Sequence, residues 1–180
     1  LSTRIRLARN LRQFPFPGRA EVSQKRAVLN QCIEALSLDA NTTASDNTAV
    51  GYRALIANTT GDRNVAIGYG ALDTNTVGDR SVAVGYNALT TQNPSSNADM
   101  YNTAVGHNAM AATSTGTFNT AVGGLALDAN NTGSSNTALG YLTLSNSTTA
   151  SNNTALGSQA LQANTTGAQN TAVGKSAGAA

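Results

Sequence analysis

Apolar and polar positions follow one fixed rhythm along most of the chain. The pentad Asn-Thr-Ala-Val-Gly, with small variations, ends at eight glycines that lie 17 residues apart, except for one interval of 21 residues. These glycines are Gly51, Gly68, Gly85, Gly106, Gly123, Gly140, Gly157 and Gly174. A period of this length, kept over more than a hundred residues, is typical of a solenoid in which each coil packs on the next.

Alternation within each pentad predicts a short β-strand whose side chains point in turn to opposite faces. We expect the aliphatic residue before each glycine to form an inner ladder, with the preceding alanine on the other face. The ladder positions are Val50, Ile67, Val84, Val105, Val122, Leu139, Leu156 and Val173. Parallel stacking at about 4.8 Å per coil would place each residue over its copy. The pattern therefore predicts an all-β fold, a parallel β-solenoid of about eight 17-residue coils.

An asparagine opens every pentad except one, which begins with Ser81. The asparagines are Asn47, Asn64, Asn102, Asn119, Asn136, Asn153 and Asn170. Two roles fit equally well: an amide ladder along the stack, or a turn former at a corner of each coil.

Other positions recur at fixed offsets from the pentad glycine. A Leu or Met follows it by four residues, and a second glycine often follows it by ten. The second glycines are Gly61, Gly78, Gly116, Gly133 and Gly167, and we expect them to turn a corner with positive φ. The array is predicted to span residues 37–180, since Glu34 stands one period before Gly51.

The longer interval contains Pro94 and four extra residues, which predicts a surface loop over residues 90–101. Met100 and Tyr101 in this loop are expected either to pack it against the coil or to contact a partner.

Residues 1–36 follow a different pattern. A short strand is expected first, then a turn at Pro15 and Pro17. Apolar residues at helical spacing then predict an α-helix over about residues 20–36.

Composition narrows the possibilities further. Only 4% of the 180 residues are aromatic and 11% are charged, which is too little bulky material for a conventional globular core. Residues 1–36 carry a net charge of +5 and residues 37–180 a net charge of −3. The single Cys32 excludes an internal disulfide and a cysteine-based metal cluster. No stretch approaches the roughly 20 apolar residues of a membrane span, so no membrane insertion is expected in this segment.

The run Ser-Thr-Arg-Ile-Arg-Leu-Ala-Arg-Asn-Leu, followed by Phe-Pro-Phe-Pro, resembles the start of the catalytic domain of guanidino phosphotransferases. This is the creatine and arginine kinase family, and the run is most similar to bacterial protein-arginine kinases. The resemblance implies that Ser2, Arg4 and Arg6 contact the phosphates of ATP and that the protein is cytoplasmic. Guanidinium groups suit phosphate oxygens. The rest of such a kinase does not follow, so this segment is interpreted as a fragment too short for catalysis.

The repeats carry a second resemblance. Ser81-Val82-Ala83-Val84-Gly85 resembles the Ser-Val-Ala-Ile-Gly unit of trimeric autotransporter adhesin heads, although those units are usually shorter. The Asn-Thr-Ala-Val-Gly-Tyr repeats also look like those of phage tail-fibre proteins. The resemblance implies a left-handed parallel β-roll built as a trimer, located at a cell surface, outside the cell or on a virion. It also implies a host-surface or matrix ligand.

Three functions follow as hypotheses. The first is a non-enzymatic structural or adhesive segment of a surface fibre. It forms a homotrimer because each coil is too lean to be stable alone, and its alanine and glycine face lets backbones approach closely. The second is the phosphotransferase fragment. The third is an ice-binding solenoid, suggested by a row of threonines that Val65 and Val82 interrupt. These threonines are Thr103, Thr120, Thr137, Thr154 and Thr171.

No catalytic residue, metal ligand, nucleic-acid partner or cofactor is predicted, apart from ATP under the second hypothesis. His107 occupies a position held elsewhere by tyrosine and is expected to belong to a surface ladder.

Overall fold

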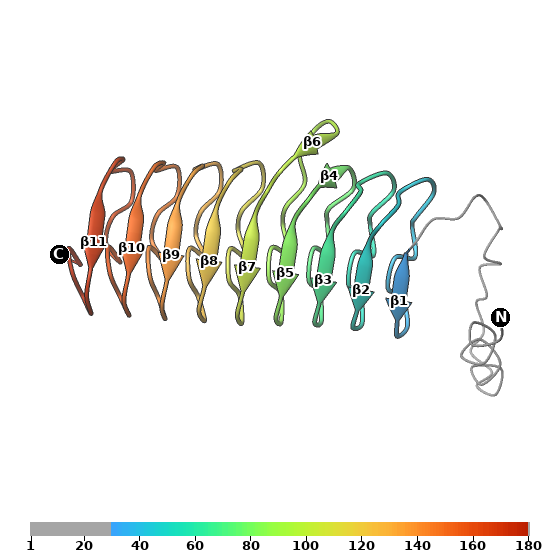
Figure 1. The fold of residues 1–180 in the computed structure, drawn as a ribbon, viewed down its shortest axis with the longest axis horizontal. Helices are drawn as coiled ribbons and strands as arrows, with labels where there is room; N and C mark the ends of the chain where they lie inside the picture. The colour runs from blue at the N-terminus through green and yellow to red at the C-terminus, as the bar shows by residue number, and fades with distance from the viewer. Residues whose placement is uncertain (1–29, 180) are drawn as a thin grey trace, which may run out of the picture.

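Residues 30–179, the part that the computed structural model describes, form one β-solenoid (Figure 1). Its main sheet has nine parallel strands in the order β1-β2-β3-β5-β7-β8-β9-β10-β11. The strands are β1 (Gln31–Ile33), β2 (Thr48–Val50), β3 (Val65–Ile67), β5 (Val82–Val84), β7 (Thr103–Val105), β8 (Thr120–Val122), β9 (Thr137–Leu139), β10 (Thr154–Leu156) and β11 (Thr171–Val173). The prediction of a parallel β-solenoid with one strand per pentad is confirmed.

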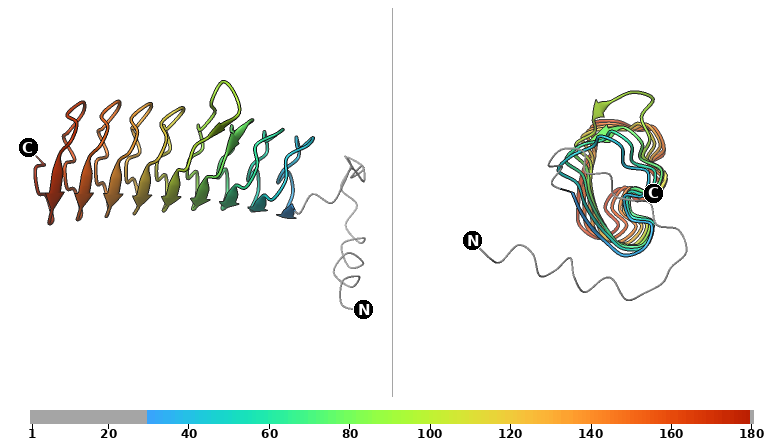
Figure 2. Two further views of the ribbon diagram at one scale, coloured as in Figure 1. Left: turned by 45° about the horizontal axis from the view of Figure 1, so that its top comes forward. Right: turned by 90° about the vertical axis from the view of Figure 1, so that its right-hand side faces the viewer.

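Every strand pairs with its copy in the next coil without a shift of register. Thr120 in β8, for example, lies opposite Thr137 in β9, and Ala121 lies opposite Ala138. The coils follow one another along a single axis, and their outlines superpose in the end-on view (Figure 2). Each residue therefore has its sequence equivalent as a direct neighbour.

The four extra residues do not disturb this register, because Val82 in β5 pairs directly with Thr103 in β7. They lie in a loop that projects from the stack and contains β6 (Ala98–Asp99), which pairs with β4 (Gly78–Asp79) (Figure 1). Met100 is buried against the coil, whereas the exposed ring of Tyr101 stacks on Phe118 with 5.4 Å between centroids.

The predicted helix over residues 20–36 is wrong where the structure describes the chain. Residues 31–33 form β1, which pairs with β2, so the first coil begins before Ser37. Asn30 already makes the contacts of a pentad asparagine, since its side chain accepts a hydrogen bond from the Asn47 N–H at 2.8 Å. Gln31-Cys32-Ile33 has the polar, small and branched order of Thr-Ala-Val, and a neighbouring strand supplies backbone partners that outweigh helical spacing. Residues 20–29 lie outside the described range.

The two faces of the strands are the reverse of the prediction. Alanine at the middle position of each strand points into the coil, while the valine, isoleucine or leucine after it points outward. Ala49, Ala66, Ala83, Ala104, Ala121, Ala138 and Ala155 have no exposed surface. Ile67 and Leu139, by contrast, are 39% and 43% exposed. The alanine face is thus the inside of the coil, and it is not available to a neighbouring chain.

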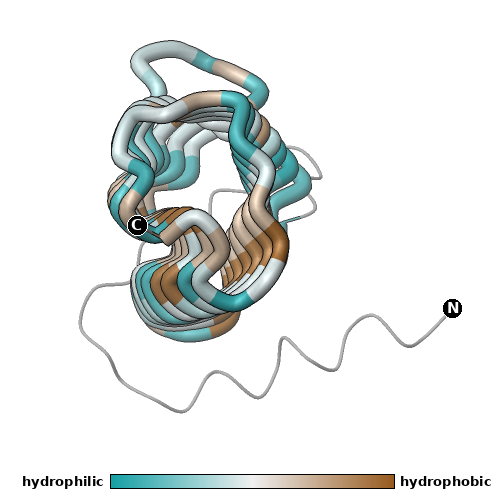
Figure 3. The backbone as a smooth tube through the Cα atoms, turned by 90° about the vertical axis from the view of Figure 1, so that its left-hand side faces the viewer, coloured by the Kyte–Doolittle hydropathy of each residue, from teal (hydrophilic) through white to brown (hydrophobic). Residues whose placement is uncertain are grey.

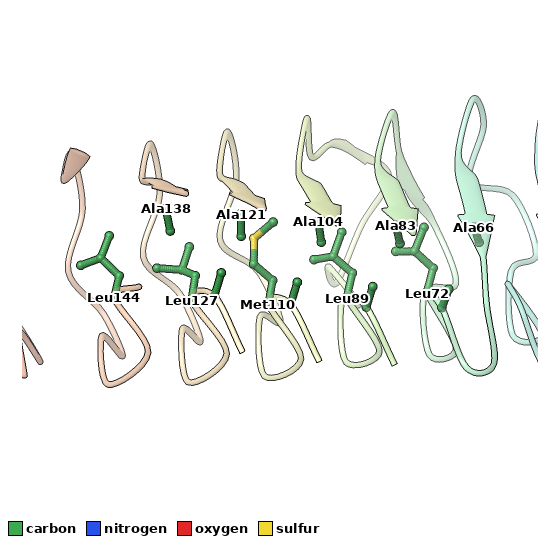
Figure 4. Packing of buried hydrophobic residues seen from close by; sticks show 14 of the residues in the cluster. Ala66, Leu72, Ala83, Leu89, Ala104, Met110, Ala121, Leu127, Ala138 and Leu144 are labelled. Carbon is green, nitrogen blue, oxygen red and sulfur yellow. The ribbon is translucent and has the colours of Figure 1, made fainter. Parts of the chain in front are cut away.

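A second inward column explains this reversal. The residue four positions after each pentad glycine fills the interior opposite the strand alanines (Figure 4). This column consists of Leu55, Leu72, Leu89, Met110, Leu127, Leu144 and Leu161. Because one large side chain per coil already fills the narrow interior, the strand facing it has room for only a methyl group. Hydrophobic residues accordingly gather around the strand and the turn after it, and the opposite part of the coil is largely hydrophilic (Figure 3).

Left-handed backbone conformations produce the tight turn after each strand. The pentad glycines have φ between 123° and 140°, and the inward leucines that follow them have φ near 50°. A Cβ at Gly106 would lie 2.5 Å from the carbonyl oxygen of Gly123 in the next coil, so only glycine fits there.

The second glycines were predicted to have positive φ, and this is wrong, because their φ lies outside that region. Glycine is needed at these positions because atoms of the same or the next coil lie too close to leave room for a side chain. A Cβ at Gly61 would lie 2.4 Å from the Gly78 carbonyl oxygen.

Candidate functional site

A buried column of asparagines joins each coil to the next. The side-chain Oδ1 of Asn102 accepts a hydrogen bond from the backbone N–H of Asn119 at 2.9 Å. The Asn119 side chain in turn donates through Nδ2 to the Gly133 carbonyl at 2.8 Å. The other pentad asparagines repeat one or both of these bonds. The two predicted roles are therefore combined, since each asparagine holds a corner and stacks in a ladder, chiefly through backbone partners.

A second polar column, which the sequence pattern was not taken to predict, lies seven residues after the pentad glycine. It contains Asn58, Asn75, Gln92, Thr113, Asn130 and Ser147, which are buried, and Asn164, which is half-buried. Asn58 donates through Nδ2 to the Gly61 carbonyl at 2.9 Å, and Asn130 makes the same bond to Gly133 at 3.0 Å. The recurrence of asparagine three residues before the second glycine was the available signal.

Ser81 is the one residue of the first column that is not asparagine, and Gln92 in the second column compensates for it. Ser81 is too short to replace the pentad asparagine, and Gln92 is longer than the asparagine it replaces. Gln92 Oε1 accepts hydrogen bonds from Ser81 Oγ at 3.1 Å and from Asn102 Nδ2 at 3.0 Å. Two departures from the repeat thus keep one buried network intact.

The outer face of the main sheet presents two parallel columns of side chains. One holds the first residue of each strand, which is threonine or valine except for Gln31 in β1, and the other holds valine, isoleucine or leucine from the third position. None of the nine strands contains a charged residue. The residues predicted as an inner ladder, Val50 to Val173, form this aliphatic outer column instead. A continuous uncharged and partly apolar face of this length is typical of an interaction surface.

An aromatic column lies beside the aliphatic one, formed in most coils by the residue directly after the pentad glycine. Tyr52, Tyr69, Tyr86 and His107 stack in sequence, with 5.2 to 5.6 Å between ring centroids. The prediction that His107 belongs to a surface ladder is confirmed by its stacking on Tyr86 at an interplanar angle of 9°.

Two ion pairs link neighbouring coils at the surface. Arg53 donates to both carboxylate oxygens of Asp73, at 2.9 and 3.0 Å, and this contact raises the pKa of the Arg53 guanidinium. Arg80 pairs with Asp99, and its guanidinium carbon lies 5.6 Å from the ring centroid of Tyr101. At such exposed positions these pairs stabilise the stack only modestly.

Within residues 30–179 no three His, Cys, Asp or Glu side chains come together in a way that could hold a metal ion. The same range contains no helix long and apolar enough to cross a membrane. Ser2, Arg4 and Arg6 lie outside the described residues, so their contact with ATP phosphates stays a prediction.

Fold and surface together define a β-solenoid repeat protein whose columns of like residues run the length of the stack. No protein-family model matches the sequence, and no match was found among curated proteins or solved structures.

Proposed function

We propose that the solenoid is a non-enzymatic structural and adhesive segment of a surface or virion fibre, assembled as a homotrimer. One observation carries this proposal: the outer sheet face is uncharged, lined by an aliphatic column, and covered by none of residues 30–179 along its nine strands. Ile33 and Val173, at the two ends of this column, are 60% and 66% exposed.

The occupant that fits this face is a second copy of the same chain. Nine strands at about 4.8 Å spacing give a face roughly 40 Å long, and the two outward columns with their side chains make it about 15 Å wide. Such a face offers about 600 Å² per partner, which is near the lower end for a specific interface. Copies that share the same repeat along their axes can match column to column over the whole length. Covering this face would remove from water the aliphatic side chains that the single chain leaves exposed.

Sedimentation velocity combined with light scattering tests the assembly directly. We expect a species with three times the 18.2 kDa mass of the chain. Val122→Glu places a carboxylate in the middle of the aliphatic column and should shift the protein towards monomer. Asn146→Glu adds the same charge at an exposed turn position and should leave the mass unchanged. A folded wild-type monomer at every concentration would contradict the proposal.

Ice binding is the second candidate, and the two outward columns favour it. The threonine row, which Val65 and Val82 interrupt, lies beside a column of aliphatic side chains, and both columns repeat in register from coil to coil. Such a face can order water in a regular array. Thermal hysteresis at freezing, lost in Thr120→Lys but kept in Asn146→Lys, would support this function. Freezing behaviour equal to that of an inert protein of the same mass would exclude it.

A further inference from the structure

The aromatic column beside the sheet lacks a ring in one coil, and we call the space that this ring would fill the vacancy. Tyr52, Tyr69, Tyr86 and His107 stack without interruption, and the next coil then has Gly124 at the same position. Tyr141 restores a ring one coil further on. Because the ring is missing at Gly124, the faces of His107 and Tyr141 that point towards this coil have no stacked neighbour from the column.

Neither the backbone nor the packing requires glycine at this position. The φ of Gly124 lies outside the left-handed region, and a Cβ there would meet only the Tyr141 ring, at 3.5 Å, an ordinary van der Waals contact. The preceding Gly123 differs on both counts, since its φ is +140° and its Cβ would lie 2.4 Å from the Gly140 carbonyl oxygen. Among the described residues, and apart from its neighbours in the chain, the Tyr141 ring is thus the only group within 4 Å of a Cβ at Gly124.

The dimensions of the vacancy suit one planar ring. His107 and Tyr141 are two coils apart, which at parallel-sheet spacing separates their rings by about 10 Å. A ring midway would lie about 5 Å from each, within the range for stacked aromatic groups. This spacing matches the 5.2 Å between the Tyr86 and His107 centroids.

The surroundings are uncharged. Residues 120–127 read Thr-Ala-Val-Gly-Gly-Leu-Ala-Leu, and Val122 and Leu125 on either side of the two glycines are half-buried. His107 and Tyr141 are both exposed, so a ligand can enter from solvent.

We propose that the vacancy over Gly124 is a binding site for an uncharged planar aromatic ring, held between His107 and Tyr141. The ligand chemistry is that of a phenol or an indole, whether it is a free aromatic compound or an aromatic side chain of another protein. The site acts in addition to the assembly face and does not depend on it.

His107 gives a direct signal for this site, because it is the only histidine in the chain. In a titration of the full chain with indole, followed by NMR, the imidazole protons should move upfield by ring-current shift and reach saturation. A linear response without saturation, or no response, would overturn the proposal.

Two variants separate the site from general aromatic adhesion. Gly124→Tyr supplies the missing ring, so it should weaken indole binding at least about tenfold. Ser158→Tyr adds a ring on the far side of Tyr141 and leaves the vacancy open, so it should bind like wild type. Equal binding by Gly124→Tyr and wild type would refute the site. Should Gly124→Tyr not fold, Tyr141→Ala removes one wall and should weaken binding severalfold, and unchanged binding by that variant counts equally against the site.

A second titration distinguishes the two sources of the ring. A short uncharged peptide with one Trp that shifts the His107 signals, while its Trp→Ala version does not, identifies a protein side chain as a competent ligand. Binding of indole alone restricts the site to free aromatic compounds.

Discussion

Buried asparagines do at the residue scale what large apolar side chains do in most cores. They satisfy backbone groups of two neighbouring coils at once, which an apolar side chain could not do. A coil shifted by one residue would break these bonds, so they also fix the register.

Asn119→Ala tests this role. The substitution leaves the Asn136 N–H buried without its partner, which costs about 1 to 3 kcal/mol, whereas the Gly133 carbonyl keeps the hydrogen bond from Asn130. We therefore expect the free energy of unfolding to fall by about 1 to 3 kcal/mol in chemical denaturation. Asn146→Ala is the control, since this side chain is exposed, and it should change stability by less than about 0.5 kcal/mol. Equal effects of the two substitutions would contradict the role.

The raised pKa of Asp128 predicts that the stability of the fold depends on pH. Burial raises the pKa of its carboxyl group, and hydrogen bonds from backbone amides oppose this only in part. Because the folded-state pKa lies above the unfolded value, the contribution of Asp128 is most favourable at low pH and is lost as pH rises through the folded pKa. Asp128→Asn should therefore be more stable than wild type at pH 7, and this difference should vanish below about pH 4. Thermal unfolding across this pH range measures it, and a wild type more stable than the variant at pH 7 would contradict the sign.

At the scale of the element, the turn after each strand decides which residues face inward. A left-handed glycine and a left-handed leucine four residues later bend the chain back, so that leucine enters the coil and the aliphatic strand residue stays outside.

Gly106→Ala and Gly124→Ala form a matched pair for this turn. The first forces a Cβ to within 2.5 Å of the Gly123 carbonyl at a φ of 137°, whereas the second meets only ordinary contact. We expect a loss of at least about 2 kcal/mol for Gly106→Ala, since such strain costs on the order of 1 to 3 kcal/mol before the clash is added. Gly124→Ala should be nearly neutral, and comparable losses in both variants would mean that clearance between coils is not what selects glycine.

The sequence predicted where the strands of the pentads are, but it did not predict which of their side chains point into the coil. The 17-residue period reveals the strands and their parallel stacking, because each residue must meet its copy. A three-residue strand with apolar side chains on both faces, such as Val65-Ala66-Ile67, gives no sign of which face is inner. That choice depends on Leu72, whose inward position follows from a backbone conformation that leucine rarely adopts.

Some features of the candidate sites could likewise be predicted from the sequence, and others could not. The position of His107 in a tyrosine row was visible in the repeat, and so was the first asparagine column. The second polar column is less regular, with asparagine at four of its seven positions, and its burial depends on the path of the coil. The first coil was missed because Glu34 replaces the pentad glycine and residues 31–33 match the repeat only by size and polarity.

At the scale of the whole molecule, stability comes from stacking, and no coil has a core of its own. One leucine or methionine and two alanines per coil supply most of the buried apolar surface. Each coil depends on its neighbours for backbone hydrogen bonds, as expected of a quasi-one-dimensional repeat protein. The same repetition turns single residues into long surface columns, and these columns support both the assembly face and the aromatic site.

Distances between spin labels test this stack most directly. In a Cys32→Ser background, cysteines at Thr48 and Thr137 carry labels five coils apart, and cysteines at Thr48 and Thr171 carry labels seven coils apart. With the labelled chain diluted in unlabelled chain, pulsed electron paramagnetic resonance should give backbone separations of about 24 Å and about 34 Å, apart from the length of the labels. Two narrow distributions that differ by about 10 Å are the predicted result. Broad distributions, or a separation that does not grow with the number of coils, would contradict the parallel in-register stack.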